Sequence, residues 1–91
     1  MASKENTYKN IYKENYAKVM RLCMGYTVGD EALAKDLAQE TFIKVWQNLD
    51  GFRNESGIGT WIYRICVNTC LAEIRKQRKK DRNLSLDTIQ V

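Results

Sequence analysis

The chain has 91 residues, no proline, no histidine and five glycines, and 44% of its residues are hydrophobic. That length supports one domain with a modest core, while the scarcity of turn residues disfavours a β fold and favours long helices. The net charge of +4 and the pI of about 9.1 point weakly to an anionic partner, and no apolar run approaches the roughly 18 residues of a membrane span.

The first predicted helix runs from about Asn6 to Tyr26, because apolar and aromatic residues recur at every third or fourth position. The residues of this face are Tyr8, Ile11, Tyr12, Tyr16, Val19, Cys23 and Tyr26. We expect Asn6 or Thr7 to cap the start of the helix, and Gly25 and Gly29 to bracket its end.

The second predicted helix begins after Asp30, a good N-cap residue, and runs to about Asn48, before Asp50-Gly51. One face should enter the core, and it consists of Ala34, Ala38, Thr41, Phe42, Val45 and Leu49. The opposite face carries Asp36, Gln39, Glu40, Ile43 and Gln47. An isoleucine within acidic and amide side chains could dock a basic partner helix, although a solvated face with one stray isoleucine is also common.

A polar loop from Phe52 to Gly57 precedes a third predicted helix, which begins between Ser56 and Gly59 and continues to about Arg78 or beyond. Two apolar stripes on this helix predict that it is wedged between two neighbours. The first stripe consists of Ile58, Ile62, Ile65, Cys66 and Thr69, and the second of Tyr63, Val67, Cys70 and Ile74. The expected fold class is therefore all-α, a small bundle of three or four helices with a polar loop before the last long one.

The excess positive charge lies in the second half of the chain. Residues 1–50 carry seven basic and seven acidic side chains, whereas residues 51–91 carry eight and four, and six of those eight lie between Arg75 and Arg82. The outer arc of the third helix consists of Thr60, Arg64, Asn68, Leu71, Arg75 and Arg78, and it continues into Lys76, Lys79 and Lys80. Guanidinium and amide groups can read bases and bind phosphates, but basic residues near a helix C-terminus also favour the helix dipole.

The loop and Trp61 form a third candidate site. Unpaired bases stack on aromatic rings, and loop amides and hydroxyls can bind their edges. The alternative is that Trp61 and Phe52 are ordinary core residues.

An enzyme is disfavoured, because the chain has no histidine, no glycine-rich phosphate loop and no Ser or Cys with an obvious base. We therefore expect no catalytic residues and no cofactor. Three cysteines and no signal peptide predict reduced thiols in a cytoplasmic protein. Cys66 and Cys70 have a spacing that could hold a metal, but two thiolates alone make a weak site and favour buried small hydrophobes.

Two segments resemble a known family. Asp36-Leu37-Ala38-Gln39-Glu40-Thr41-Phe42 with Val45-Trp46 is similar to the polymerase-binding helix of bacterial sigma factors. Phe52-Arg53-Asn54-Glu55-Ser56, followed by Thr60-Trp61-Ile62-Tyr63-Arg64-Ile65 and Asn68, is similar to their promoter-reading segment. Both segments, in this order and at this spacing, give residues 8–82 a resemblance to region 2 of the extracytoplasmic-function (ECF) group.

The resemblance implies two binding surfaces. The first would bind the clamp helices of the polymerase β′ subunit through Asp36, Gln39, Glu40, Ile43 and Gln47. The second would capture a flipped base of the single-stranded non-template −10 element, and its residues are Phe52, Arg53, Asn54, Ser56, Thr60, Trp61, Arg64 and Asn68, with Arg75, Lys76, Arg78 and Lys79 on phosphates. The family also implies an anti-sigma factor as a regulatory partner.

The sequence departs from parts of the family pattern. Ile62 follows Trp61 where the larger housekeeping sigma factors have a second tryptophan, so we expect a thinner melting wedge and a stricter dependence on promoter sequence. Ala72 and Val67 replace the Asp or Asn and the basic residue of many relatives, so their contacts are not expected. Gly57 and Gly59 make the loop glycine-rich, and its base preference should differ.

The expected domain spans residues 1–82, and residues 83–91 are the expected start of a linker, cut before a second domain that would read the −35 element. Two other classes stay open from the residues alone. One is a basic helical DNA-binding regulator that does not contact the polymerase, and the other is a helical adaptor that binds only proteins.

Overall fold

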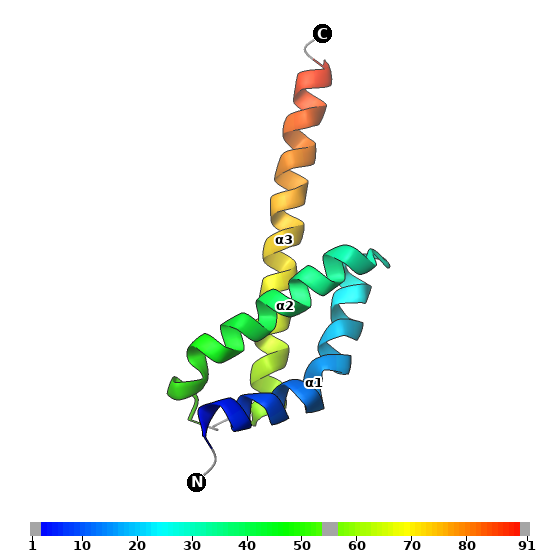
Figure 1. Ribbon diagram of the computed structural model, residues 1–91. Coiled ribbons are helices and arrows are strands. Elements are labelled where there is room, and N and C mark those ends of the chain that lie inside the picture. Colours follow the sequence, from blue (N-terminus) through cyan, green and yellow to red (C-terminus); the bar gives the residue numbers. More distant parts are fainter. Residues whose placement is uncertain (1–2, 54–56, 90–91) are drawn as a thin grey trace.

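The computed structural model describes the backbone of residues 3–53 and 57–89 and the side chains of residues 3–53 and 57–81. Within these residues there are three α-helices, α1 (Lys4–Tyr26), α2 (Glu31–Asn48) and α3 (Ile58–Ile89), one 3-10 turn, η1 (Leu49–Gly51), and no strand. The all-α prediction is confirmed. In Figure 1, α1 and α2 lie against the first half of α3, and the second half of α3 extends beyond them.

The helix ends agree with the predictions except at the start of α1. Asp30 caps α2 as predicted, since its carboxylate accepts a hydrogen bond from the backbone of Leu33 at 3.1 Å. The predicted caps of α1 are wrong, because the Ser3 hydroxyl accepts from the backbone of Asn6 at 3.1 Å and the helix begins earlier. The third helix was expected to run to about Arg78 or beyond, and its backbone stays helical to Ile89, with no glycine or proline after Gly59 to end it.

Each helix packs against both others, and the fully buried residues include small side chains such as Ala34, Ala38 and Cys66 beside larger ones such as Phe42 and Ile62. The buried apolar core consists of Ile11, Val19, Cys23, Ala34, Leu37, Ala38, Phe42, Val45, Ile62, Cys66 and Cys70. The predicted core face of α2 is buried except for Leu49, which is half-buried. Leu37 was missed because α2 contacts two neighbours, so its buried arc is wider than one stripe.

The third helix is wedged between α1 and α2 as predicted, but its second stripe is partly wrong. Cys70 is buried, whereas Tyr63 is 52% exposed. Tyr63 lies at the edge of a shallow cavity of about 150 Å³ between α1 and α3, beside Leu22 and Lys18. The tyrosine ring thus covers the edge of the core rather than entering it.

Buried polar side chains in the core bond to their own helices. The hydroxyls of Thr41 and Thr69 donate to carbonyls four residues earlier at 2.8 Å and 2.7 Å, and the Asn15 amide does the same at 2.8 Å. No buried side-chain oxygen or nitrogen among the described residues lacks a partner. The same residues include no helix that is both long and apolar enough to cross a membrane.

The turn between α1 and α2 places a β-branched residue in a left-handed conformation. The backbone N–H of Gly29 donates to Met24 at 2.9 Å and that of Val28 donates to Gly25 at 3.4 Å, which is the Schellman pattern at a helix C-terminus. Glycine usually occupies the position that Val28 holds here with φ 54°. Because Val28 is 92% exposed, packing does not compensate for this strain.

We expect Val28→Gly to stabilise the domain by about 0.5–1 kcal/mol, since relief of left-handed strain outweighs the added entropy of the unfolded chain. Urea unfolding followed by circular dichroism measures the change. Val28→Ala keeps the Cβ atom and is the control, with a smaller gain. A glycine variant less stable than the native chain would contradict this account.

Candidate functional site

Five side chains form one exposed surface on α2, which we call the acidic α2 face. Its members are Asp36, Gln39, Glu40, Ile43 and Gln47, and all five are exposed. Ile43 is 51% exposed and is the large apolar side chain of this face. These five residues therefore lie together on the solvent side of α2, as the helical period of the sequence predicted.

A lysine between α2 and α3 positions one of these carboxylates. The Nζ atom of Lys44 lies 3.5 Å from Glu40 Oε1 and donates to the Thr69 hydroxyl at 3.0 Å. An exposed ion pair of this kind contributes little to folding stability. The same lysine therefore links the Glu40 carboxylate on α2 to the Thr69 hydroxyl on α3.

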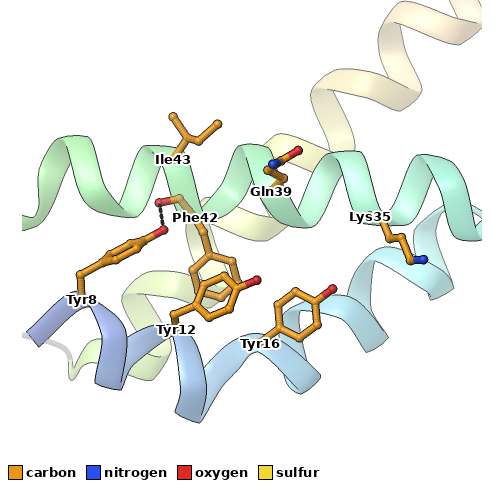
Figure 2. Close-up of a pocket in the computed structure, with 7 residues that line it drawn as sticks. All are labelled: Tyr8, Tyr12, Tyr16, Lys35, Gln39, Phe42 and Ile43. Carbon is orange, nitrogen blue, oxygen red and sulfur yellow. Dashed lines mark hydrogen bonds between the residues drawn. The ribbon is translucent and has the colours of Figure 1, made fainter. Parts of the chain in front are cut away.

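A groove of about 400 Å³ adjoins the acidic α2 face (Figure 2). Tyr8, Tyr12 and Tyr16 line it from α1, while Gln39 and Ile43 line it from α2. The sequence assigned the three tyrosines to a core face and missed this groove. Their spacing of four residues places the three tyrosines on one face of α1. That this face lies at the edge of the core follows only from the way α1 packs against α2.

Tyr8 is fixed at one end of this groove. Its hydroxyl donates to the Phe42 carbonyl at 3.2 Å, and its ring packs edge-on against Trp46 at 5.2 Å. Burial, and then the neighbouring Tyr12, raise the pKa of Tyr8, so its hydroxyl stays a donor at neutral pH. Lys4 lies 4.1 Å from the centre of the Trp46 ring and pairs with Asp50 at 3.1 Å. These contacts join the start of α1 to the end of α2.

The two aromatic residues near the loop contact each other. The rings of Phe52 and Trp61 stack with centroids 4.6 Å apart and an angle of 27°, and both residues are half-buried. Gly57 has φ +75°, and its carbonyl accepts from the backbone of Trp61 at 3.2 Å, so a glycine conformation starts α3. Arg53 is exposed. Asn54 and Ser56, also expected in this site, lie outside the described residues.

The outer arc of α3 is exposed as the helical period predicts. Its exposed members are Thr60, Arg64, Asn68, Arg75, Lys76, Arg78, Lys79 and Lys80, whereas Leu71 is half-buried. In the part of the chain with described side chains, none of these cations forms an ion pair. The 32 residues of α3 span about 48 Å, so a basic track continues beyond the bundle.

The cysteines form a buried cluster. Burial, and then Cys66, raise the pKa of Cys70 to about 11, and burial together with the two other thiols raises the pKa of Cys23. All three cysteines are buried, so the prediction that Cys66 and Cys70 are small buried residues is confirmed. The sequence paired Cys66 with Cys70 and missed that α1 brings Cys23 to them.

Comparison with known proteins identifies the domain. Residues 11–80 match the Sigma-70 region 2 family. The chain belongs to this family. It is 38% identical to the ECF RNA polymerase sigma factor SigW of Bacillus subtilis over 69 residues, which is 76% of this chain and 35% of that protein.

Two other similar proteins are also ECF sigma factors. The ECF RNA polymerase sigma-E factor of Escherichia coli is 40% identical over 55 residues, 60% of this chain and 29% of that protein. SigG of Mycobacterium tuberculosis is 40% identical over 47 residues, 52% of this chain and 13% of that protein. The chain thus spans about a third or less of these relatives, and no solved structure gives a significant match. The predicted resemblance to the ECF group is confirmed.

We expect the domain to lose stability as the pH rises above about 9. An unfolded cysteine releases its proton near pKa 9.0, whereas Cys70 keeps it in the folded chain up to about 11. In this window the unfolded state binds fewer protons, so a rise in pH favours unfolding. Urea unfolding at about pH 8 and about pH 10.5 measures the loss.

Cys23→Ala/Cys70→Ala is the matched control, because it removes two of the thiols and retains every other ionisable side chain. The double variant should lose less stability between the two pH values than the native chain. Equal losses would show that the thiols do not contribute.

Proposed function

We propose that this chain is the part of an alternative sigma factor that binds the polymerase β′ clamp and recognises and melts the promoter −10 element. One observation carries the proposal. The two segments that resemble sigma factors lie in one matched family region. Asp36, Gln39 and Glu40 on α2 and Thr60, Arg64 and Asn68 on α3 are exposed, so these side chains remain available to partners.

The acidic α2 face has the composition of a protein-binding surface. Exposed Ile43 supplies an apolar centre, and Asp36 and Glu40 supply negative charge for a basic partner helix. Lys44 pairs with Glu40 and bonds to Thr69, which favours one position of the carboxylate on this face. The tyrosine-lined groove beside Gln39 and Ile43 offers further area for the same partner.

Gln39→Ala/Glu40→Lys should weaken binding to the polymerase core by more than about tenfold, because like charges then face each other at the interface. Fluorescence anisotropy with the labelled domain and the core enzyme measures the dissociation constant. Glu14→Lys makes the same charge change at an exposed site on α1 and should leave binding unchanged. Equal affinities of the double variant and the native chain would reject this contact.

The second proposed surface, formed by the loop from Phe52 and the exposed side of α3, would open the promoter by binding melted DNA. No covalent bond forms or breaks in this step. Flipping a base out of the stack costs a few kcal/mol, and contacts to the free base and its phosphates offset this cost. The stacked rings of Phe52 and Trp61 give the loop a rigid aromatic base. Arg64 and Asn68 follow on the exposed side of α3, and the basic track then continues along the phosphates.

The domain should bind a single-stranded non-template −10 oligonucleotide more tightly than the duplex. Lys79→Ala should lower the slope of log K against log salt by about 0.7, the value for one lost phosphate contact on a single strand. Lys13→Ala removes an exposed lysine from α1 and is the control. Anisotropy at several salt concentrations measures both, and no preference between the DNA forms at low salt would favour the adaptor class.

The same proposal implies a cellular location, a regulatory partner and domain boundaries for the chain. We place the protein in the cytoplasm with the polymerase and promoter DNA, and with an anti-sigma factor as its regulatory partner. Residues 1–82 form the functional unit, and residues 83–91, whose backbone is helical as far as Ile89, begin the connection to another domain.

A further inference from the structure

Three thiols from two helices meet inside the bundle. Cys23 comes from α1, and Cys66 and Cys70 lie one turn apart on α3. The Cys23 sulfur is 3.7 Å from each of the other two, and all three sulfurs lie within 4.8 Å of one another. Each residue is fully buried, with 0% exposure.

We propose that Cys23, Cys66 and Cys70 form a binding site for a trivalent, thiophilic metalloid of the arsenite class, held by three thiolates and no other protein ligand. This inference does not depend on the proposed sigma function, because it uses residues of the core rather than of either surface.

The sulfur positions suit a shared ion. A thiophilic ion lies about 2.3 Å from each bound sulfur, so two sulfurs on one ion are separated by about 3.5–4 Å. Cys23 already meets this condition with both partners at 3.7 Å. Cys66 and Cys70 lie within 4.8 Å of each other, so rotation of these two side chains would bring the third pair of sulfurs toward the same separation.

The number of ligands separates the candidate ions. The chain contains no histidine, and among the described residues no carboxylate joins the three sulfurs. Structural zinc sites in proteins almost always have four ligands, and these three residues have 0% exposure, so surface solvent does not reach them to supply a fourth. An ion that accepts three soft ligands fits better.

Charge separates the remaining candidates. Three thiolates carry three negative charges, so a trivalent centre gives a neutral complex, whereas divalent zinc leaves one negative charge and monovalent copper leaves two. Net charge in an apolar core is costly.

The binding reaction is an exchange without a change of oxidation state. Arsenous acid, As(OH)₃, reacts with three thiols, so that three As–O bonds and three S–H bonds break and three As–S bonds form. The three protons leave with the three hydroxide groups as three water molecules, and arsenic remains trivalent. The product links α1 to α3, and access to the buried thiols requires a transient local opening between these helices.

The test uses the full, reduced chain and sodium arsenite as the probe. Native mass spectrometry should show one arsenic bound with the loss of three protons, and arsenic X-ray absorption should show three sulfur neighbours and no oxygen. No binding at millimolar arsenite, or oxygen bonded to the bound arsenic, would overturn the proposal. Zinc that competes successfully against equimolar arsenite would also overturn it.

Variants identify the ligands. Removing a residue that only hydrogen-bonds to a metal ligand weakens metal binding by about 10–100-fold. Cys23→Ala removes a direct ligand, so it should raise the arsenite dissociation constant by more than about 100-fold. Val45→Ala is the control, because it truncates another fully buried residue and keeps all three thiols. Unchanged affinity in a folded Cys23→Ala chain would overturn the site. If that variant does not fold, the absorption measurement on the native chain decides the question.

Discussion

Close packing of three helices through small side chains is the constraint on which the rest of the structure depends. Ala34 and Ala38 of α2 are fully buried, as are Cys23 on α1 and Cys66 and Cys70 on α3. Small residues at these crossings let the helix axes approach, so a chain of 91 residues can bury a continuous core. The larger apolar side chains then surround this centre, and the opposite faces of the helices remain available to partners.

The two proposed surfaces are connected through this packing. Gln39 and Glu40 on α2 and Arg64 and Asn68 on α3 lie on helix segments whose other side packs in the core, so these side chains project from packed supports. Lys44 makes the connection direct, since it pairs with Glu40 on the acidic α2 face and bonds to Thr69 on α3. A partner that binds the acidic α2 face therefore contacts a surface held by the helix that carries the basic track.

The sequence by itself determined the helices and their outward faces. The period of an α-helix fixes which residues share a face, so exposed Ile43 on α2 and Arg64 and Asn68 on α3 could be assigned without coordinates. Local chemistry likewise identified Asp30 as a cap. The family resemblance came from residues close together in the chain, and it gave these faces their proposed roles.

Only the tertiary structure decided which helices meet and where their surfaces end. The groove beside the tyrosines and the exposure of Tyr63 depend on how α1 crosses α2 and α3, and no periodicity contains that angle. The stacking of Phe52 on Trp61 depends on the path of the loop between them. The approach of Cys23 to thiols more than forty residues away is likewise a long-range contact. A local sequence pattern determines which residues share one face of a helix, but the packing of the whole bundle determines which helix that face contacts.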